Sequence, residues 1–200
     1  KKILFLTLIL NTCYNYICSA TLDTARFNFE DGTLQGFYLD TINSAQGVTL
    51  TVSEDFAIDS KSARVTVNFT GNNSIWNQAG IAIDNQIPSQ NISAKVYLPT
   101  GAPSNILAKI FFQDADWQLQ ESSPIFLTVN SWSDLNWNIS GLLFKNPVKR
   151  LGVTMGTTSN YSGFIYVDSI DFIAATFTAT PTMTSTRTAT TTYTPAPPSP

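Results

Sequence analysis

Short apolar segments in which every second residue is apolar follow one another along most of the chain. In the segment 63–69, which reads ARVTVNF, Ala, Val, Val and Phe alternate with Arg, Thr and Asn. Because side chains of a β-strand point to opposite faces in turn, such a segment has one apolar and one polar face. Similar segments, separated by clusters of Gly, Pro, Asn, Asp and Ser, span residues 26–30, 48–53, 79–84, 92–98, 106–113, 124–129, 134–139, 148–155 and 163–173. The pattern predicts an all-β domain, either an antiparallel sandwich or a barrel.

The two ends of the chain differ in composition from this central part. Residues 1–20 begin with two lysines, continue with a short apolar run and end in Cys-Ser-Ala, which is typical of a secretory signal peptide. Residues 176–200 are rich in Thr and Pro and have almost nothing apolar to bury, which is typical of a disordered linker. We therefore predict a secreted protein with a signal peptide (1–20), one folded module (21–175) and a linker (176–200) leading to a covalently linked module. No segment is long and apolar enough to predict a membrane span.

The composition argues against several kinds of chemistry. Histidine is absent, and both cysteines lie in the predicted signal peptide. Zinc sites normally use Cys and His, and hydrolytic triads use His as the base, so neither is expected. The chain has 11 Lys and Arg against 14 Asp and Glu, and no basic cluster. Nucleic acid is therefore not expected as a partner, since its binding depends on neutralising phosphates.

The four tryptophans fall into two groups. Trp132 and Trp137 belong to an alternating apolar segment, and we predict that they pack in the core. Trp76 and Trp117 lie among Asn, Gln and Asp, where a large ring either packs in a loop or meets a ligand. Sugar rings stack on indoles much as bases do, and neighbouring amides bind hydroxyl groups. The predicted sugar-binding residues are Tyr38, Trp76, Asn77, Gln78, Lys109, Gln113, Trp117, Gln118 and Glu121.

Both ends of the predicted domain resemble a known family. Residues 27–37 (FNFEDGTLQGF) are similar to the F-x-F-E-x-G-x-x-x-G-W opening of secreted jelly-roll carbohydrate-binding modules, and residues 165–170 (IYVDSI) resemble their closing strand. The chain departs from the family at Phe37, where tryptophan is usual, and at Ser169, where a second aspartate is usual. The resemblance implies a single-domain antiparallel β-sandwich (jelly roll). It also implies non-catalytic binding of a plant-type polysaccharide, of mannan or β-glucan type, that brings an attached module to its substrate.

The resemblance further implies a structural calcium ion (Ca2+). In the family the opening Glu and the closing Asp hold this ion together with loop carbonyls, which nominates Glu30 and Asp168 here. Asp59 or Lys61 would add a backbone oxygen. Calcium takes about six to eight oxygen ligands, so such a site would tie both ends of the domain together. The alternative is that the two acids are solvated groups on edge strands.

Two other classes of function stay open on the sequence alone. A surface or adhesion domain that binds protein would expose an apolar patch on the order of several hundred Å2. A small carboxylate-based glycoside hydrolase would use two of Asp114, Asp116 and Glu121 as acid and base, and it would release reducing sugar from a polymer.

Overall fold

The computed structural model describes residues 25–40, 49–71, 77–88 and 90–172, without the side chains of residues 77 and 78. The predicted signal peptide, the predicted linker and Trp76 lie outside these ranges. Across the ranges that are described, no helix has the length and apolar character needed to cross a membrane.

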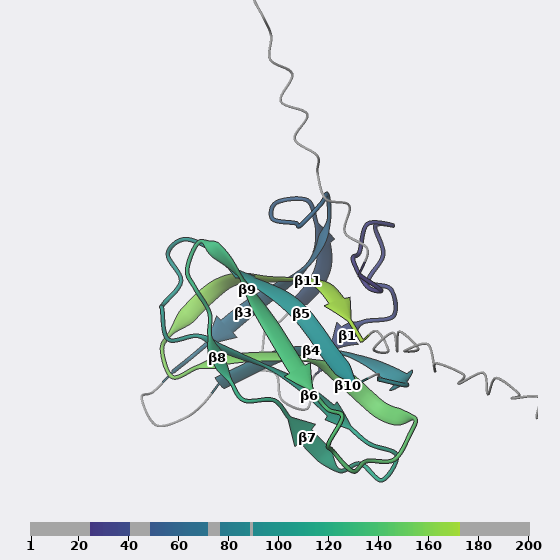
Figure 1. Cartoon of the computed structure of the whole chain (residues 1–200). Helices are drawn as coiled ribbons and strands as arrows, with labels where there is room; N and C mark the ends of the chain where they lie inside the picture. The colour runs from purple at the N-terminus through teal and green to yellow at the C-terminus, as the bar shows by residue number, and fades with distance from the viewer. Residues whose placement is uncertain (1–24, 41–48, 72–76, 89, 173–200) are drawn as a thin grey trace, which may run out of the picture.

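The described strands form two sheets that lie in two layers. The six-stranded sheet has the order β1 (Tyr38–Leu39), β4 (Asn77–Gln86), β10 (Val148–Thr157), β6 (Leu107–Gln113) and β7 (Leu119–Glu121), and β8 (Ile125–Phe126) also pairs with β6. The five-stranded sheet has the order β2 (Thr49–Ser53), β3 (Ser62–Phe69), β11 (Tyr161–Asp171), β5 (Asn91–Leu98) and β9 (Ser131–Asn138). In Figure 1 the five-stranded sheet occupies the upper part of the molecule and the six-stranded sheet the lower part. The strands pair antiparallel, which confirms the predicted antiparallel β-sandwich.

Most of the segments predicted from alternation are strands, but two are much shorter than expected. Of the segment 26–30, only Phe27 pairs with β11: its N–H donates to the Ile170 carbonyl (3.0 Å), and the Ile170 N–H donates back (2.9 Å). The backbone then turns, because Phe29 has a φ of 59° and its carbonyl accepts a hydrogen bond from Gly32 (2.9 Å). The segment 124–129 provides only the two residues of β8, and the short strands β1 and β7 were not predicted.

The hydrophobic core lies between the sheets and consists of the inward-facing half of each strand. Val65 and Val67 of β3 and Leu151 and Val153 of β10 are buried in one cluster, as the alternation predicts. Trp137 packs against this cluster, with its ring centroid 5.2 Å from that of Phe112. The predicted packing of Trp137 in the core is confirmed.

The prediction for Trp132 is wrong. Trp132 is the register neighbour of Tyr97, and it alternates with Leu135 of the same strand, which faces the core. Trp132 therefore lies on the outer face of the five-stranded sheet, where its ring is half-buried and its centroid is 5.5 Å from that of Tyr97.

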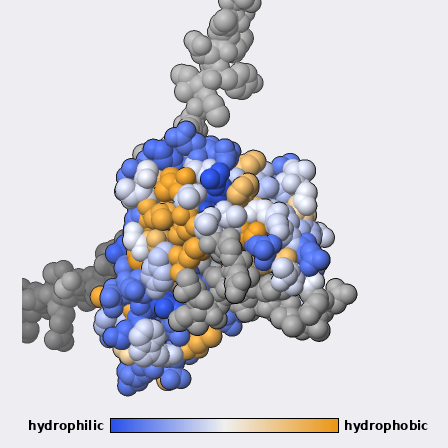
Figure 2. Space-filling model, turned by 180° about the vertical axis from the view of Figure 1, so that it is seen from behind, coloured by the Kyte–Doolittle hydropathy of each residue, from blue (hydrophilic) through white to orange (hydrophobic). Residues whose placement is uncertain are grey.

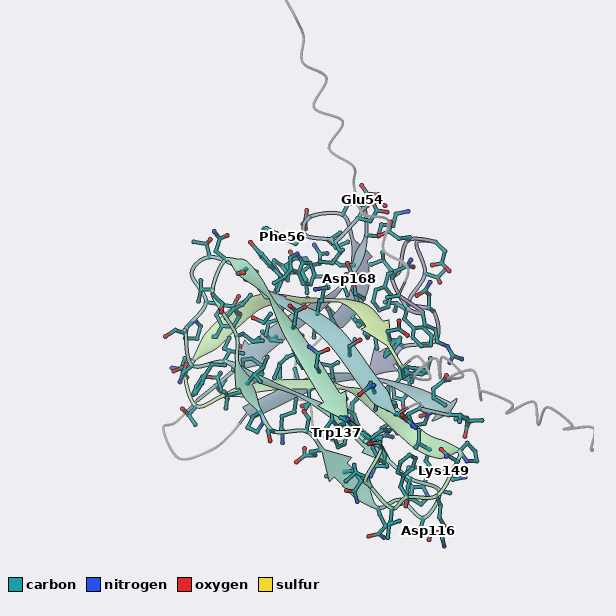
Figure 3. The ribbon with its side chains drawn as sticks, viewed as in Figure 1. Glu54, Phe56, Asp116, Trp137, Lys149 and Asp168 are labelled. Atoms are coloured by element: carbon teal, nitrogen blue, oxygen red, sulfur yellow. The ribbon has the colours of Figure 1, made fainter. Side chains whose placement is uncertain are left out.

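The loop between β2 and β3 folds onto this outer face. Phe56 stacks on Tyr97 with a centroid separation of 4.4 Å. Asp168, which is completely buried, accepts the backbone N–H of Ile58 through its Oδ2 atom (2.9 Å). Phe56 and Asp168 lie at the same end of the sandwich in Figure 3, and Asp116 lies at the opposite end. The stacking of Phe56 on Tyr97 and the hydrogen bond to Asp168 thus hold the loop on β5 and β11.

Replacing Asp168 tests the importance of this loop for stability. Asp168→Ala leaves the Ile58 N–H without its charged acceptor, so we expect a loss of about 3 kcal/mol. For a domain of this size, the melting temperature should fall by about 6–12 °C in differential scanning calorimetry. The control Asp134→Ala removes an exposed acid that pairs with Lys95, and this should cost about 1 kcal/mol or less. Equal melting temperatures for the two variants would contradict the assignment.

Candidate functional site

Every second residue of the six-stranded sheet points away from the core. One row of register neighbours crosses five strands of this outer face and contains Tyr38, Ala82, Gly152, Phe111 and Glu121. Since neighbouring strands are about 4.8 Å apart, the row is about 19 Å long. Its central members Ala82, Gly152 and Phe111 are buried, whereas Tyr38 is half-buried and Glu121 is exposed. The accessible groups of the row therefore stand at the two edges of the sheet.

At the β1 edge, a network of polar contacts fixes the ring of Tyr38. The Tyr38 hydroxyl donates to Asp84 Oδ1 (2.6 Å), and the guanidinium carbon of Arg150 lies 5.8 Å from the ring centroid. Arg150 forms an ion pair with the buried Asp40 (3.0 Å). Burial and the hydrogen bond to Asp84 raise the pKa of Tyr38 above its ordinary value. The ring is thus held in place and keeps its proton at neutral pH.

At the opposite edge, the charged groups are also paired with one another. Lys109 Nζ donates to Glu121 Oε1 (2.7 Å), and both side chains are partly accessible. Gln113 is half-buried between its register neighbours Arg150 and Leu119. A charged ligand would have to compete with these internal partners, whereas the hydroxyl groups of a neutral ligand can bind beside them. The outer face is therefore suited to neutral polar ligands.

The turn between β6 and β7 carries an exposed tryptophan at this edge. Trp117 is 57 % exposed and has a φ of 63°, in the left-handed region. Gln118 is exposed, and Leu119 at the start of β7 is 53 % exposed. A tryptophan that is accessible on the rim of a sheet is available to stack on the apolar face of a flat ligand.

The structure brings together most of the predicted sugar-binding residues that it describes. Tyr38, Lys109, Gln113 and Glu121 share the outer face of the six-stranded sheet, and Trp117 and Gln118 lie in the turn beside it. Asn77 and Gln78 begin β4, at the far end of β10, but the positions of their side chains lie outside the described residues.

Sequence reasoning missed Arg150, Asp84 and Asp40. The signal for Arg150 was present, because it alternates with the core residue Leu151 and therefore had to face outward. The pairing of Arg150 with Asp40 could not be predicted from the sequence, because the two residues are 110 positions apart. Phe37, which departs from the tryptophan of the opening motif that the sequence resembles, is buried in the core against the ring of Phe27 (5.2 Å) and is not on the outer face.

The model of one protein family, described as mannanase, galactose-binding domain-like, matches residues 27–169. The chain belongs to this family. The match covers all the strands described above, apart from the last residues of β11. No curated protein matches the chain.

Solved structures of carbohydrate-binding modules share the fold of this mannanase galactose-binding-like domain. One comes from a study of promiscuous specificity in the β-sandwich superfamily, and it has a TM-score of 0.62 and 23 % sequence identity to this chain. The alignment covers 76 % of the present chain but only 62 % of the length of the solved chain. CBM27-1 of Caldicellulosiruptor saccharolyticus, in complex with mannohexaose, has a TM-score of 0.58 and 18 % identity over 74 % of this chain and 97 % of its own. CBM28, specific for non-crystalline cellulose, has a TM-score of 0.57 and 15 % identity over 74 % of this chain and 94 % of its own.

The two acids predicted to bind calcium converge on one loop of the domain. Glu30 accepts the backbone N–H groups of Ser60 (3.0 Å) and Lys61 (2.9 Å), and Asp168 accepts that of Ile58 (2.9 Å). The Lys61 ammonium group donates to the Glu30 carbonyl (3.4 Å). Within the described ranges, no group of three or more Asp, Glu, His or Cys side chains forms a metal site. A cation here would therefore need carbonyl oxygens of the loop in addition to the two carboxylates.

The pKa of Glu30 makes the contribution of this loop depend on pH. Burial opposes ionisation, but the hydrogen bonds from Ser60 and Lys61 outweigh it and hold the pKa of Glu30 below its ordinary value of 4.5. A carboxyl group with a lowered pKa in the folded state stabilises the fold above the unfolded-state pKa. This stabilisation is lost as the pH falls through the folded-state pKa.

Glu30→Gln should therefore lower the melting temperature at pH 7, and the difference from the wild type should shrink as the pH falls below about 4.5. Thermal unfolding followed by circular dichroism between pH 7 and pH 3 measures this difference. Glu54→Gln is the matched control, because Glu54 is an exposed acid at the start of the loop between β2 and β3. A difference between Glu30→Gln and wild type that stays constant over this range would rule out the linkage.

Proposed function

We propose that this domain binds a polysaccharide of mannan or β-glucan type without cleaving it. The observation that carries the proposal is the exposed indole of Trp117 at the rim of a sheet face whose ionic groups are paired internally. The indole offers an apolar platform for a sugar ring, and the paired groups offer donors and acceptors to its hydroxyls. Membership of the mannanase galactose-binding domain-like family supports a glycan of this class.

The state of the acids supports a role in binding over a role in catalysis. Asp114 is buried and accepts three backbone N–H groups, Asp116 pairs with Lys145, and Glu121 pairs with Lys109. Both a retaining and an inverting glycosidase need one protonated carboxyl group as the general acid. Backbone hydrogen bonds, first of all that from Gln118, lower the pKa of Asp114 and disfavour its protonated form.

The domain would act by bringing an attached partner to its substrate. A linker at residues 176–200 would raise the effective concentration of a linked catalytic module near the polymer without adding any contact. Secretion through the predicted signal peptide would place the protein where plant-type polysaccharides are found.

Binding of a protein surface is the second candidate function. The rear view of the molecule shows apolar side chains gathered in one part of a largely hydrophilic surface (Figure 2). An exposed apolar patch of this kind is suited to binding a protein partner. This alternative predicts that the domain binds no glycan.

Affinity gels that contain soluble mannan, glucomannan or β-glucan test the binding proposal. The wild-type domain should be retarded, and Trp117→Ala should weaken binding about 5- to 150-fold, because loss of one stacked ring removes about 1–3 kcal/mol. The control Phe164→Ala removes another exposed ring, which lies on the outer face of the five-stranded sheet and is 42 % exposed. Unretarded wild-type protein on every glycan would refute the proposal, and equal effects of the two substitutions would refute the role of Trp117.

We also propose that a calcium ion bound by Glu30 and Asp168 stabilises the domain. Both carboxylates lie against residues 58–61, and oxygen ligands are what calcium prefers. Differential scanning calorimetry in calcium and in EDTA should show a lower melting temperature in EDTA, because a ligand of the folded state stabilises it. The shift should be absent in Glu30→Gln. An unchanged melting temperature of the wild type in EDTA would eliminate the metal.

A further inference from the structure

The backbone of Trp117 is in a conformation that bulky residues rarely adopt. Its φ of 63° brings the Cβ atom of an L-residue close to the backbone, and glycine or asparagine is the usual choice at such a position. Burial does not offset this cost, because the side chain is 57 % exposed. Surrounding contacts must therefore hold the residue in place.

The side chain of Asp114 supplies these contacts on both sides of Trp117. Its Oδ1 atom accepts the N–H groups of Asp116 (2.9 Å) and Gln118 (2.9 Å), the two chain neighbours of the tryptophan. The backbone of Asp114 completes the turn: its carbonyl accepts the Trp117 N–H (2.9 Å), and its N–H donates to the Gln118 carbonyl (3.1 Å). Asp114 is only 5 % exposed, so water is largely kept from these bonds.

A second loop ties this turn to the core. Asp114 Oδ2 accepts the Lys145 N–H (3.3 Å), and the Lys145 carbonyl accepts the Ala115 N–H (3.0 Å). The residue before Lys145, Phe144, packs on Phe112 of the core with a centroid distance of 4.8 Å. The turn that carries Trp117 is thus fixed to both β6 and the neighbouring loop.

We infer that Asp114 is a positioning residue that holds the Trp117 ring ready for a sugar. This inference rests on the proposed function, since it assigns Asp114 a role through Trp117 and no contact with the ligand. A ring that is fixed before binding loses less conformational freedom on binding, so the hydrogen bonds of Asp114 raise affinity.

Two substitutions in the same turn separate this role from an effect of charge. Asp114→Asn and Asp116→Asn remove the same charge, but only the Asp114 side chain accepts backbone N–H groups on both sides of Trp117. In Asp114→Asn the remaining oxygen is an uncharged and weaker acceptor, and the new NH2 group faces the Lys145 N–H in place of Oδ2. We expect Asp114→Asn to weaken mannohexaose binding about 3- to 10-fold in isothermal titration calorimetry, as expected for a side chain that is ordered only on binding. Asp116→Asn should change the affinity by less than about twofold, because its ion pair with Lys145 is exposed.

The position of the ring can be measured independently of affinity. The measurement is fluorine NMR of protein labelled with fluorotryptophan. The resonance that is missing from the spectrum of Trp117→Phe belongs to Trp117. It should shift and broaden in Asp114→Asn and stay unchanged in Asp116→Asn. If Asp114→Asn does not fold, Asp114→Ser replaces it, because the serine hydroxyl still accepts an N–H group of this turn and places no NH2 donor against the Lys145 N–H.

Each outcome of these measurements decides one question. An unchanged affinity or an unchanged Trp117 resonance in the Asp114 variant overturns the inference, and so does equal weakening by the two Asn variants. A lower melting temperature with unchanged affinity would show that Asp114 is only structural. If the wild type binds no glycan but the resonance responds as expected, the proposed function fails and the positioning of Trp117 stands.

Discussion

The hydrophobic contact between the two sheets is the interaction on which the rest of the structure depends. Every second side chain of the strands is buried in this contact, as Val65 and Val67 of β3 and Leu151 and Val153 of β10 show. The positions between them are left for the outer faces. Arg150 reaches the outer face because Leu151 is buried, and Lys109 reaches it because Ile110 is buried. Core packing therefore decides which residues of distant strands meet on the surface.

The outer faces of the two sheets use similar residues for different purposes. On the five-stranded sheet, Phe56 covers Tyr97 and thereby docks a loop, so the rings there mainly stabilise the fold. On the six-stranded sheet, Tyr38 is fixed by Asp84 while Trp117 projects into solvent. What distinguishes a ring that binds a ligand from one that packs is whether the chain itself covers it. Composition alone does not show this difference.

Sequence reasoning predicted the long strands because alternation reflects burial directly, and it failed where structure depends on pairing across the fold. The strands β1 and β7 are too short to show alternation, and Trp132 lay in an apolar segment whose core-facing positions are Leu135 and Trp137. Trp117, which lies among polar residues in the sequence, is in a turn and has a ring that is 57 % exposed. The partners of Arg150 and the hydrogen bonds of Asp114 involve residues that only the folded chain brings near. Local patterns therefore predict the longer strands, whereas the groups that hold an exposed ring in place require coordinates.

The row that crosses the outer face joins residues 38, 82, 111, 121 and 152, which come from separate parts of the chain. No single hairpin contains this surface, so a proteolytic fragment or a partly unfolded domain would lack it. Retention on a glycan column would then act as a quality check during purification, since only chains that have folded completely are captured. Conversely, a ligand that binds only the folded surface would stabilise it, and the domain should resist unfolding for as long as the ligand stays attached.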